Sequence, residues 1–164
     1  KYLAKQVNVT IEDDFSYNSE DKKKKELLYK LYKDVANTYY MTLYEDFGKS
    51  GFSYLMSRNL TKETIKKFGL GYAPKTYSYM YKIMKDKGYD DNILFEYKLF
   101  SFKNDKVFDF FYDRVMFPLI DANWNVISFQ GRILGSGDQK YINTAQSIIY
   151  NKSKNLFAYN FYRP

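Results

Sequence analysis

The sequence predicts an α+β fold in which a helical lobe is followed by a small, mainly antiparallel sheet. Up to about residue 100, apolar residues recur at steps of three and four, which is typical of amphipathic helices. Beyond that point they alternate at steps of two, which is typical of half-buried strands. At 164 residues the chain is long enough for one domain with a core, or for two small packed lobes. We therefore expect a helical lobe over residues 1–100 and a β-rich, basic lobe over 101–164, together forming one subdomain.

A long helix is expected from about Asp21 to Asp46. It follows a short amphipathic stretch over residues 1–11 and a polar linker over 12–21. The acidic Glu20 and Asp21 suit the positive end of the helix dipole. Apolar residues at steps of three and four then form one face of the helix. This face consists of Leu27, Leu28, Leu31, Val35, Tyr39 and Leu43.

Four shorter helices are expected to complete the first lobe. We place them over residues 52–57, 62–68, 77–87 and 90–97. Hydroxyl and carboxylate side chains favour N-caps, and glycine favours the residue after a helix. The candidate N-caps are Thr61, Thr76 and Asp90 or Asp91, and the candidate stops are Gly69 or Gly71 and Gly88.

The second lobe begins with a predicted β-hairpin. RVMFPLI, residues 114–120, alternates in hydrophobicity as a half-buried strand does. Pro118 cannot donate to a neighbouring strand, so this strand lies at an edge or carries a bulge. DANWN, residues 121–125, is a turn, and residues 126–134 form the second strand. Residues 147–158 are predicted as strand or loop, followed by a short helix.

Composition excludes several classes of chemistry. The chain has no cysteine and no histidine, which excludes disulfides, thiolate metal sites and every histidine-dependent mechanism. It has no apolar run of the roughly 20 residues that a membrane span needs. The net charge of +7 fits a polyanionic partner, although AT-rich codons also favour the abundant lysine. The ends of the chain suggest a piece of a longer protein.

A glycine-rich segment, GRILGSGDQKYINTAQ at residues 131–146, is the main candidate for a binding site. Its spacing matches neither a Walker loop nor a dinucleotide-binding fingerprint. We expect a strand–turn–strand unit in which Arg132 shares a face with Gln130, and Lys140 begins the third strand. Such strands suit phosphate contacts. The alternative is a loop whose glycines supply positive φ angles and whose basic residues are only solvated.

The C-terminal 26 residues carry four positive charges and no carboxylate. These charges belong to Lys140, Lys152, Lys154 and Arg163, with aromatic residues between them. Cations neutralise phosphates and aromatic rings stack on bases, which is the pattern of single-strand binding.

Acidic residues in the second lobe do not suggest a metal-dependent catalytic centre. Two-metal nucleotidyl transfer needs several clustered carboxylates. Asp105, Asp109 and Asp113 are separated by aromatic residues, and we interpret them as solvated turn residues.

The order of motifs resembles a known family. DRVMFPLIDANWNVISFQGRILGSGDQKYINTAQSIIYNKSKNLF is similar to the N-terminal subdomain of the bacterial DnaG-type DNA primase catalytic core. YLMSRNLTKETIKKFGLGYAP resembles an earlier motif of the same family, and KYLAKQVNVTI resembles the stretch after its zinc-binding domain. The resemblance covers nearly the whole chain.

The resemblance implies a DNA-directed RNA polymerase, a nucleotidyltransferase that makes short RNA primers during replication. It implies single-stranded DNA template, ribonucleotides and an RNA–DNA hybrid as partners, with the replicative helicase bound through a C-terminal region. It also implies Mg in a TOPRIM domain, Zn in an N-terminal domain, and a cytoplasmic place at the bacterial replication fork. None of these further domains lies in this chain, so the piece is expected to be inactive alone.

By motif position, the resemblance also assigns roles to individual residues. The implied catalytic residues are Lys140, Tyr141 and Asn143, and the implied nucleic-acid- or nucleotide-binding residues are Arg114, Arg132, Lys152 and Lys154, with no metal ligand. The chain departs from the family pattern at Gln130, at residues 144–146 and at Asn151. Two other hypotheses stay open: a non-catalytic module that binds single-stranded nucleic acid, and a structural or partner-docking domain.

Overall fold

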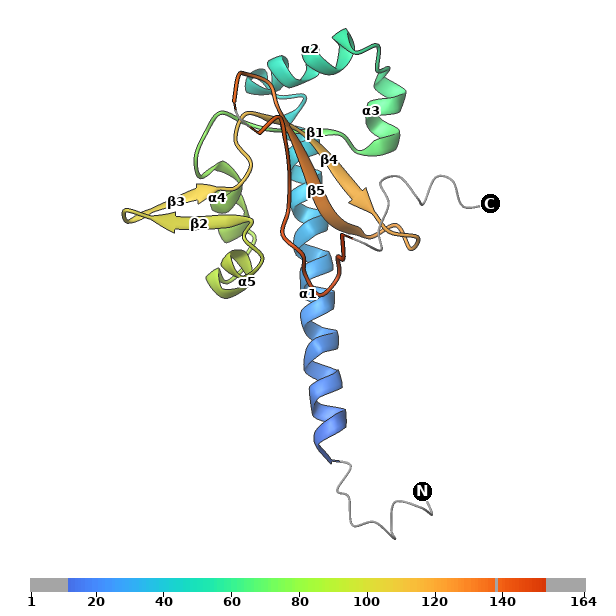
Figure 1. Cartoon of the computed structure of the whole chain (residues 1–164), viewed down its shortest axis with the longest axis vertical. Helices are drawn as coiled ribbons and strands as arrows, with labels where there is room; N and C mark the ends of the chain where they lie inside the picture. Colours follow the sequence, from blue (N-terminus) through green and yellow to red (C-terminus); the bar gives the residue numbers. More distant parts are fainter. Residues whose placement is uncertain (1–11, 138, 153–164) are drawn as a thin grey trace.

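The computed structural model describes residues 12–137 and 139–152 and has the predicted α+β fold (Figure 1). Its helices are α1 (Glu12–Thr42), the 3-10 helix η1 (Asp46–Gly48), α2 (Lys49–Ser57), α3 (Lys62–Phe68), α4 (Tyr79–Asp86) and α5 (Asp91–Glu96). Its strands are β1 (Gly71–Ala73), β2 (Phe100–Lys103), β3 (Lys106–Asp109), β4 (Arg114–Ile120), β5 (Val126–Ile133) and β6 (Tyr141–Asn143). An antiparallel sheet has the order β1-β4-β5-β6, and β2 and β3 form a separate hairpin.

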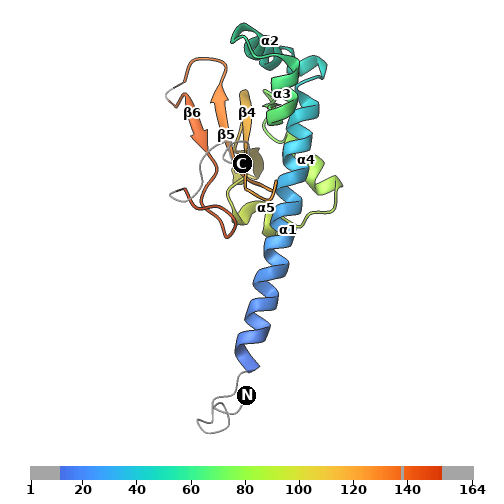
Figure 2. The same cartoon turned by 90° about the vertical axis from the view of Figure 1, so that its right-hand side faces the viewer.

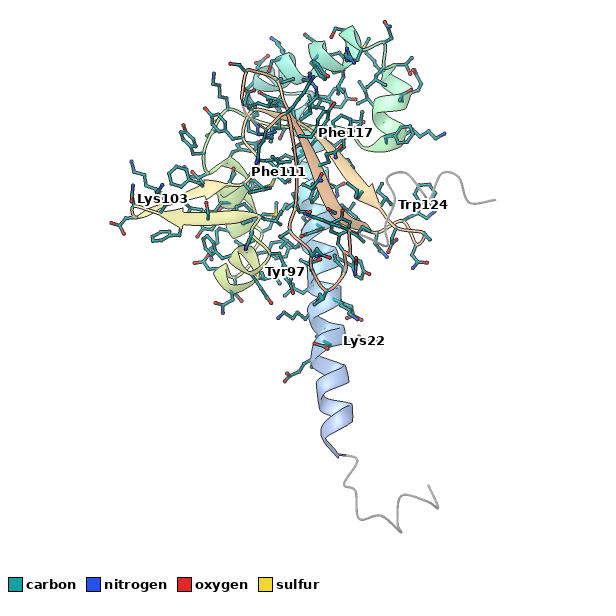
Figure 3. All side chains as sticks on the ribbon, viewed as in Figure 1. Lys22, Tyr97, Lys103, Phe111, Phe117 and Trp124 are labelled. Carbon is teal, nitrogen blue, oxygen red and sulfur yellow. The ribbon has the colours of Figure 1, made fainter. Side chains whose placement is uncertain are left out.

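Helix α1 runs along one face of the four-stranded sheet (Figure 2). The main core lies between them, where Tyr32 and Tyr39 of the helix meet Phe129 of β5 and Phe111. Figure 3 shows Phe111 in the middle of the molecule and Lys103 far out on the β2–β3 hairpin. A second core cluster joins α2 and α3 to the sheet through Leu55, Ile65, Tyr72, Val115 and their neighbours.

Helix α1 is longer than predicted. It begins at Glu12, so residues 12–21, expected as a linker, are helical. No glycine or proline interrupts this polar stretch, and the helix continues through it. The first turns project beyond the rest of the molecule, as the position of Lys22 shows (Figures 1 and 3). The projecting part ends near Lys24, whose Nζ lies 2.5 Å from Glu96 of α5.

Strand β1 corrects the expectation that the first hundred residues are entirely helical. Gly71–Ala73 pairs antiparallel with β4, with Gly71 opposite Met116. A Cβ on Gly71 would lie 2.5 Å from the backbone carbonyl carbon of Tyr39, because α1 crosses directly over this strand. Glycine is therefore required by a close backbone contact, and not by the end of helix α3.

Helix caps were predicted correctly where they are local. Thr61 caps α3, since its Oγ1 accepts a hydrogen bond from the backbone N–H of Thr64 at 3.2 Å. The helix ends at Gly69, which has a φ of 59°. The expected cap at Thr76 is wrong, because α4 begins at Tyr79.

A distant carboxylate caps α4 instead. The backbone N–H groups of Met80 and Tyr81 donate to Asp109 at the end of β3, at 2.8 and 3.1 Å. Asp109 is buried, so its interpretation as a solvated turn residue is wrong. Burial raises the pKa of Asp109 to about 7, although these N–H donors act in the opposite direction.

The β4–β5 hairpin agrees with the prediction. Asp121 closes the turn by accepting hydrogen bonds from the backbone N–H groups of Asn123 and Asn125, at 2.8 and 2.9 Å. Strand β1 pairs with β4 only as far as Met116, so Pro118 lies beyond this pairing. The register also shifts after Leu119. Pro118, which has no N–H to donate, thus faces no described partner strand on the β1 side and lies next to an irregularity in the β4–β5 pairing.

Candidate nucleic-acid interface

The glycine-rich segment connects β5 to β6, and the two strands present one polar face. Gln130 lies opposite Asn143, and Arg132 lies opposite Tyr141. Directly opposite residues of an antiparallel pair project to the same side, so these four side chains share a face. The shared face of Gln130 and Arg132 is confirmed. The Gln130 side-chain amide donates to Asn143 Oδ1 at 3.0 Å.

Arg132 is held against an aromatic ring from helix α2. Its guanidinium carbon lies 4.2 Å from the ring centroid of Tyr54, a cation–π stack. Its Nη1 donates to the Ile133 carbonyl oxygen at 2.9 Å. Tyr54 was not predicted as part of the site, because it lies far from Arg132 in the chain and its position in the helix looks like an ordinary core contact.

Arg114 does not share the face of Arg132. It lies opposite Ile133, the neighbour of Arg132 on β5, and successive residues of a strand project to opposite sides. Arg114 is buried, and its Nη1 donates to the carbonyl oxygens of Gly131 and Gln139 at 3.1 and 3.2 Å. Burial lowers the pKa of this guanidinium. Direct binding of nucleic acid by Arg114 stays a prediction, and its position does not support it.

The remaining predicted residues are exposed around β6. Lys140 and Asn143 are exposed at its two ends, and half of the Tyr141 surface is accessible, at 51%. Lys152 is also exposed, in a turn after the bridge between Ser147 and Tyr150. The predicted residue Lys154 lies outside the described residues.

One departure from the family pattern has a structural role. Thr144, the first of residues 144–146, is buried directly after β6. Its Oγ1 lies 2.6 Å from Ser128 Oγ in a hydrogen bond, and it accepts a bond from the Phe129 N–H at 3.3 Å. Thr144 therefore fixes the end of β6 against β5.

An aromatic patch, formed by Tyr77, Phe108 and Tyr112, was not foreseen from the sequence. The rings of Tyr77 and Tyr112 stack with centroids 4.7 Å apart, and Phe108 meets Tyr77 edge-on. Tyr77 is 58% exposed. Beside it lies a hollow of about 330 Å³ whose lining includes Lys82 and Lys106. Because aromatic residues are frequent throughout this chain, no local pattern distinguished these three.

The aromatic patch is connected to the glycine-rich segment through Asp113. The Asp113 carbonyl oxygen accepts a hydrogen bond from the N–H of Leu134, directly after β5, at 3.2 Å. Its carboxylate accepts one from the Tyr72 hydroxyl at 2.7 Å. The backbone that follows Tyr112 of the patch is therefore hydrogen-bonded to the backbone that follows β5.

The carboxylates in the described part of the chain do not form a metal site. Among the side chains that the structure describes, those of residues 19–137 and 139–152, no three or more Asp, Glu, His or Cys come together as metal ligands. Asp109 caps a helix and Asp113 binds a tyrosine hydroxyl, as described above. These residues do not fit a Mg or Zn centre, so no catalytic step can be assigned here to a metal. No described helix is long and apolar enough to cross a membrane.

Comparisons with known proteins agree on one family. Residues 38–163 match the family model of the DNA primase catalytic core, N-terminal domain. A DNA primase of Clostridium acetobutylicum is 36% identical over 162 residues, which cover 98% of this chain and 27% of that protein. The chain thus spans about a quarter of the length of this curated relative.

Solved structures give the same result. A DnaG primase catalytic domain bound to ssDNA superposes with a TM-score of 0.78 at 29% identity, over 85% of this chain and 45% of that one. The Aquifex aeolicus primase, comprising zinc-binding and RNA polymerase domains, gives 0.72 at 30% identity, over 82% of this chain and 33% of that one. The family model covers well over half of the sequence. The chain therefore belongs to the DNA primase family, to the N-terminal domain of the catalytic core.

Proposed function

We propose that this chain is the part of a DNA primase that holds template and nucleotide while short RNA primers are made on single-stranded DNA. The observation that carries the proposal is the shared face of Arg132 and Tyr141, with the exposed Lys140 beside them, in a member of this family. The full protein is a nucleotidyltransferase of the bacterial cytoplasm that acts at the replication fork. Its helicase contact and its metal ions belong to domains outside this chain.

Each of the proposed binding side chains, on this face or beside it, has a chemistry that suits the role. The exposed ammonium of Lys140 neutralises a nucleotide phosphate and the charge that develops during transfer. Arg132, held against the ring of Tyr54, contacts the phosphate backbone. Tyr141 has an accessible ring for stacking, and Asn143 offers an amide for hydrogen bonding. The motif resemblance assigns Lys152 and Lys154 to nucleic-acid or nucleotide binding, where their positive charges suit phosphates.

Support for a DNA-facing role comes from the relatives. One structural neighbour is a DnaG catalytic domain bound to ssDNA, and another carries a zinc-binding domain beside its RNA polymerase domain. By analogy, the template, the incoming ribonucleotides and the RNA–DNA hybrid bind across this face and the domain that supplies Mg. Zn belongs to the N-terminal domain. The isolated chain is expected not to polymerise.

Replacing Lys140 with alanine in the full-length protein tests the proposal. We expect primer synthesis to fall about 100-fold, because a charge next to the reacting phosphates is removed. The measurement is incorporation of labelled ribonucleotides on a single-stranded template. Lys33→Ala, which removes an exposed charge from helix α1, is the matched control and should retain full activity. Undiminished synthesis by Lys140→Ala would contradict the proposal.

The aromatic patch favours a second function of the same chain, which is binding of single-stranded nucleic acid without catalysis. The exposed Tyr77, stacked on the half-buried Tyr112 beside Lys82 and Lys106, offers a ring face for a base and charges for phosphates. The two functions separate experimentally. If Lys140→Ala abolishes synthesis and leaves DNA binding intact, the β5–β6 face is catalytic. If DNA binding falls as much as synthesis does, the β5–β6 face is only a binding surface.

Replacing Tyr77 with alanine should weaken binding of single-stranded DNA. Loss of one stacked base costs about 1–3 kcal/mol, which corresponds to a Kd about 5- to 150-fold higher. Fluorescence anisotropy of a labelled oligonucleotide at several salt concentrations measures this. The salt dependence should stay the same, because no charge is removed, whereas Lys106→Ala should reduce its slope by about 1. A Kd unaffected by Tyr77→Ala would exclude the patch from the binding path.

A further inference from the structure

The buried side chain of Arg114 lies across three strands of the sheet. It begins on β4, opposite Ile133 of β5. Its Nη1 donates to the carbonyl oxygen of Gly131 on β5 at 3.1 Å. The same nitrogen donates to the carbonyl oxygens of Gln139 and Lys140, just before β6, at 3.2 and 3.5 Å. Arg114 therefore joins the end of β5 to the backbone just before β6.

Gly131 makes this path possible. A Cβ at this position would lie 2.6 Å from Phe111 Cδ1 and 3.0 Å from Arg114 Cδ, so a side chain would displace the arginine. The same glycine provides one of the carbonyl acceptors. A charged donor makes a stronger hydrogen bond than a neutral one, and burial strengthens it further.

Strand β6 depends on such contacts, because it is short and lies at the end of the sheet. It has three residues, which pair only with β5 in the described sheet. The Lys140 carbonyl also accepts a hydrogen bond from the Ile133 N–H at 3.0 Å. Arg114 thus holds, from the buried side, the backbone that carries the exposed side chains of Lys140 and Tyr141.

We propose that Arg114 is a positioning residue for primer synthesis, which sets the place of Lys140 and Tyr141 through backbone carbonyls without touching nucleic acid. The inference rests on the proposed function of the β5–β6 face. It replaces the direct contact with template or nucleotide that the motif resemblance implied for this arginine. The support comes from one guanidinium nitrogen, Nη1, which reaches carbonyls at the end of β5 and just before β6.

The test is Arg114→Ala in the full-length protein, compared with Arg114→Lys and with Lys140→Ala. We expect kcat for primer synthesis to fall about 100-fold, because a small displacement of reacting groups can lower a rate by about this factor. The Kd for single-stranded DNA should change by less than about twofold, because no phosphate contact is lost. Added ethylguanidinium should restore kcat at least about tenfold in Arg114→Ala and not in Lys140→Ala. Ethylammonium is the control compound.

Two outcomes overturn the proposal. One is an unchanged kcat in Arg114→Ala. The other is a Kd for DNA that rises as much as kcat falls, with a shallower salt dependence, which would indicate direct phosphate contact. If Arg114→Ala does not fold, Arg114→Lys is the deciding variant. It should have a lower kcat and faster hydrogen exchange at the Ile133 amide. Full activity of Arg114→Lys would refute the proposal. If Lys140→Ala loses activity while Arg114→Ala keeps it, the proposed function stands and only the role proposed for Arg114 is refuted.

Discussion

Replacing Gly71 with alanine is expected to destabilise the protein by about 3 kcal/mol or more, at the upper end of the cost of overpacking. The added Cβ would lie 2.5 Å from the carbonyl carbon of Tyr39 and 2.7 Å from its oxygen. These are backbone atoms of helix α1, which cannot move aside as the end of a flexible side chain can. Strand β1 or the helix must shift, and the core between α1 and the sheet opens.

The measurement is thermal unfolding followed by circular dichroism. For a protein of this size the expected destabilisation corresponds to a fall in Tm of about 10 °C. Gly135→Ala is the matched control, because an added Cβ there has no neighbour within 4 Å, and it should change stability by less than about 0.5 kcal/mol. Equal melting temperatures of the two variants would show that α1 and β1 are further apart than described.

The stability of the protein should fall as the pH rises from about 4 to about 7, because Asp109 retains its proton in the folded state. Burial raises the pKa of this carboxyl from its ordinary value of 3.8 to about 7. Between these values the folded state binds a proton that the unfolded state has lost, so the free energy of unfolding decreases with pH. The full difference is about 4 kcal/mol. The chain contains no histidine to titrate in the same range.

Urea unfolding of wild type and Asp109→Asn between pH 4 and 8 measures this effect. The groups that face Asp109 include the backbone N–H groups of Tyr79, Met80 and Tyr81 and the buried side chain of Tyr39. The asparagine cannot ionise, so its free energy of unfolding should lack the decrease. Above about pH 8 the difference between the two proteins should be constant. Parallel curves for the two proteins throughout this range would rule out a raised pKa of Asp109.

The sequence predicted the features that depend on neighbouring residues. Helix α3 begins after Thr61 and ends at Gly69, and Asp121 closes the hairpin turn. Each of these residues acts on backbone a few residues away. Alternation in β4 and β5 gave the hairpin and placed Gln130 and Arg132 on one face. These signals are local, and local geometry is nearly independent of the rest of the fold.

Features that depend on distant contacts could not be predicted. Strand β1 has three residues, too few for a visible alternation, and it exists because β4 and α1 meet it. The cap of α4 comes from Asp109, and the support of Arg132 comes from Tyr54. The burial of Arg114 follows from the face of the sheet that α1 covers. A pattern of residue types cannot indicate which face that is.

Helix α1 has a consequence for the geometry of the whole protein. Its projecting first turns, residues 12–22, contain no glycine or proline and extend beyond the body of the molecule (Figure 1). At about 1.5 Å of rise per residue, they form a rod about 15 Å long. Packing of α1 on the sheet therefore holds the start of the described helix at a set distance from the sheet.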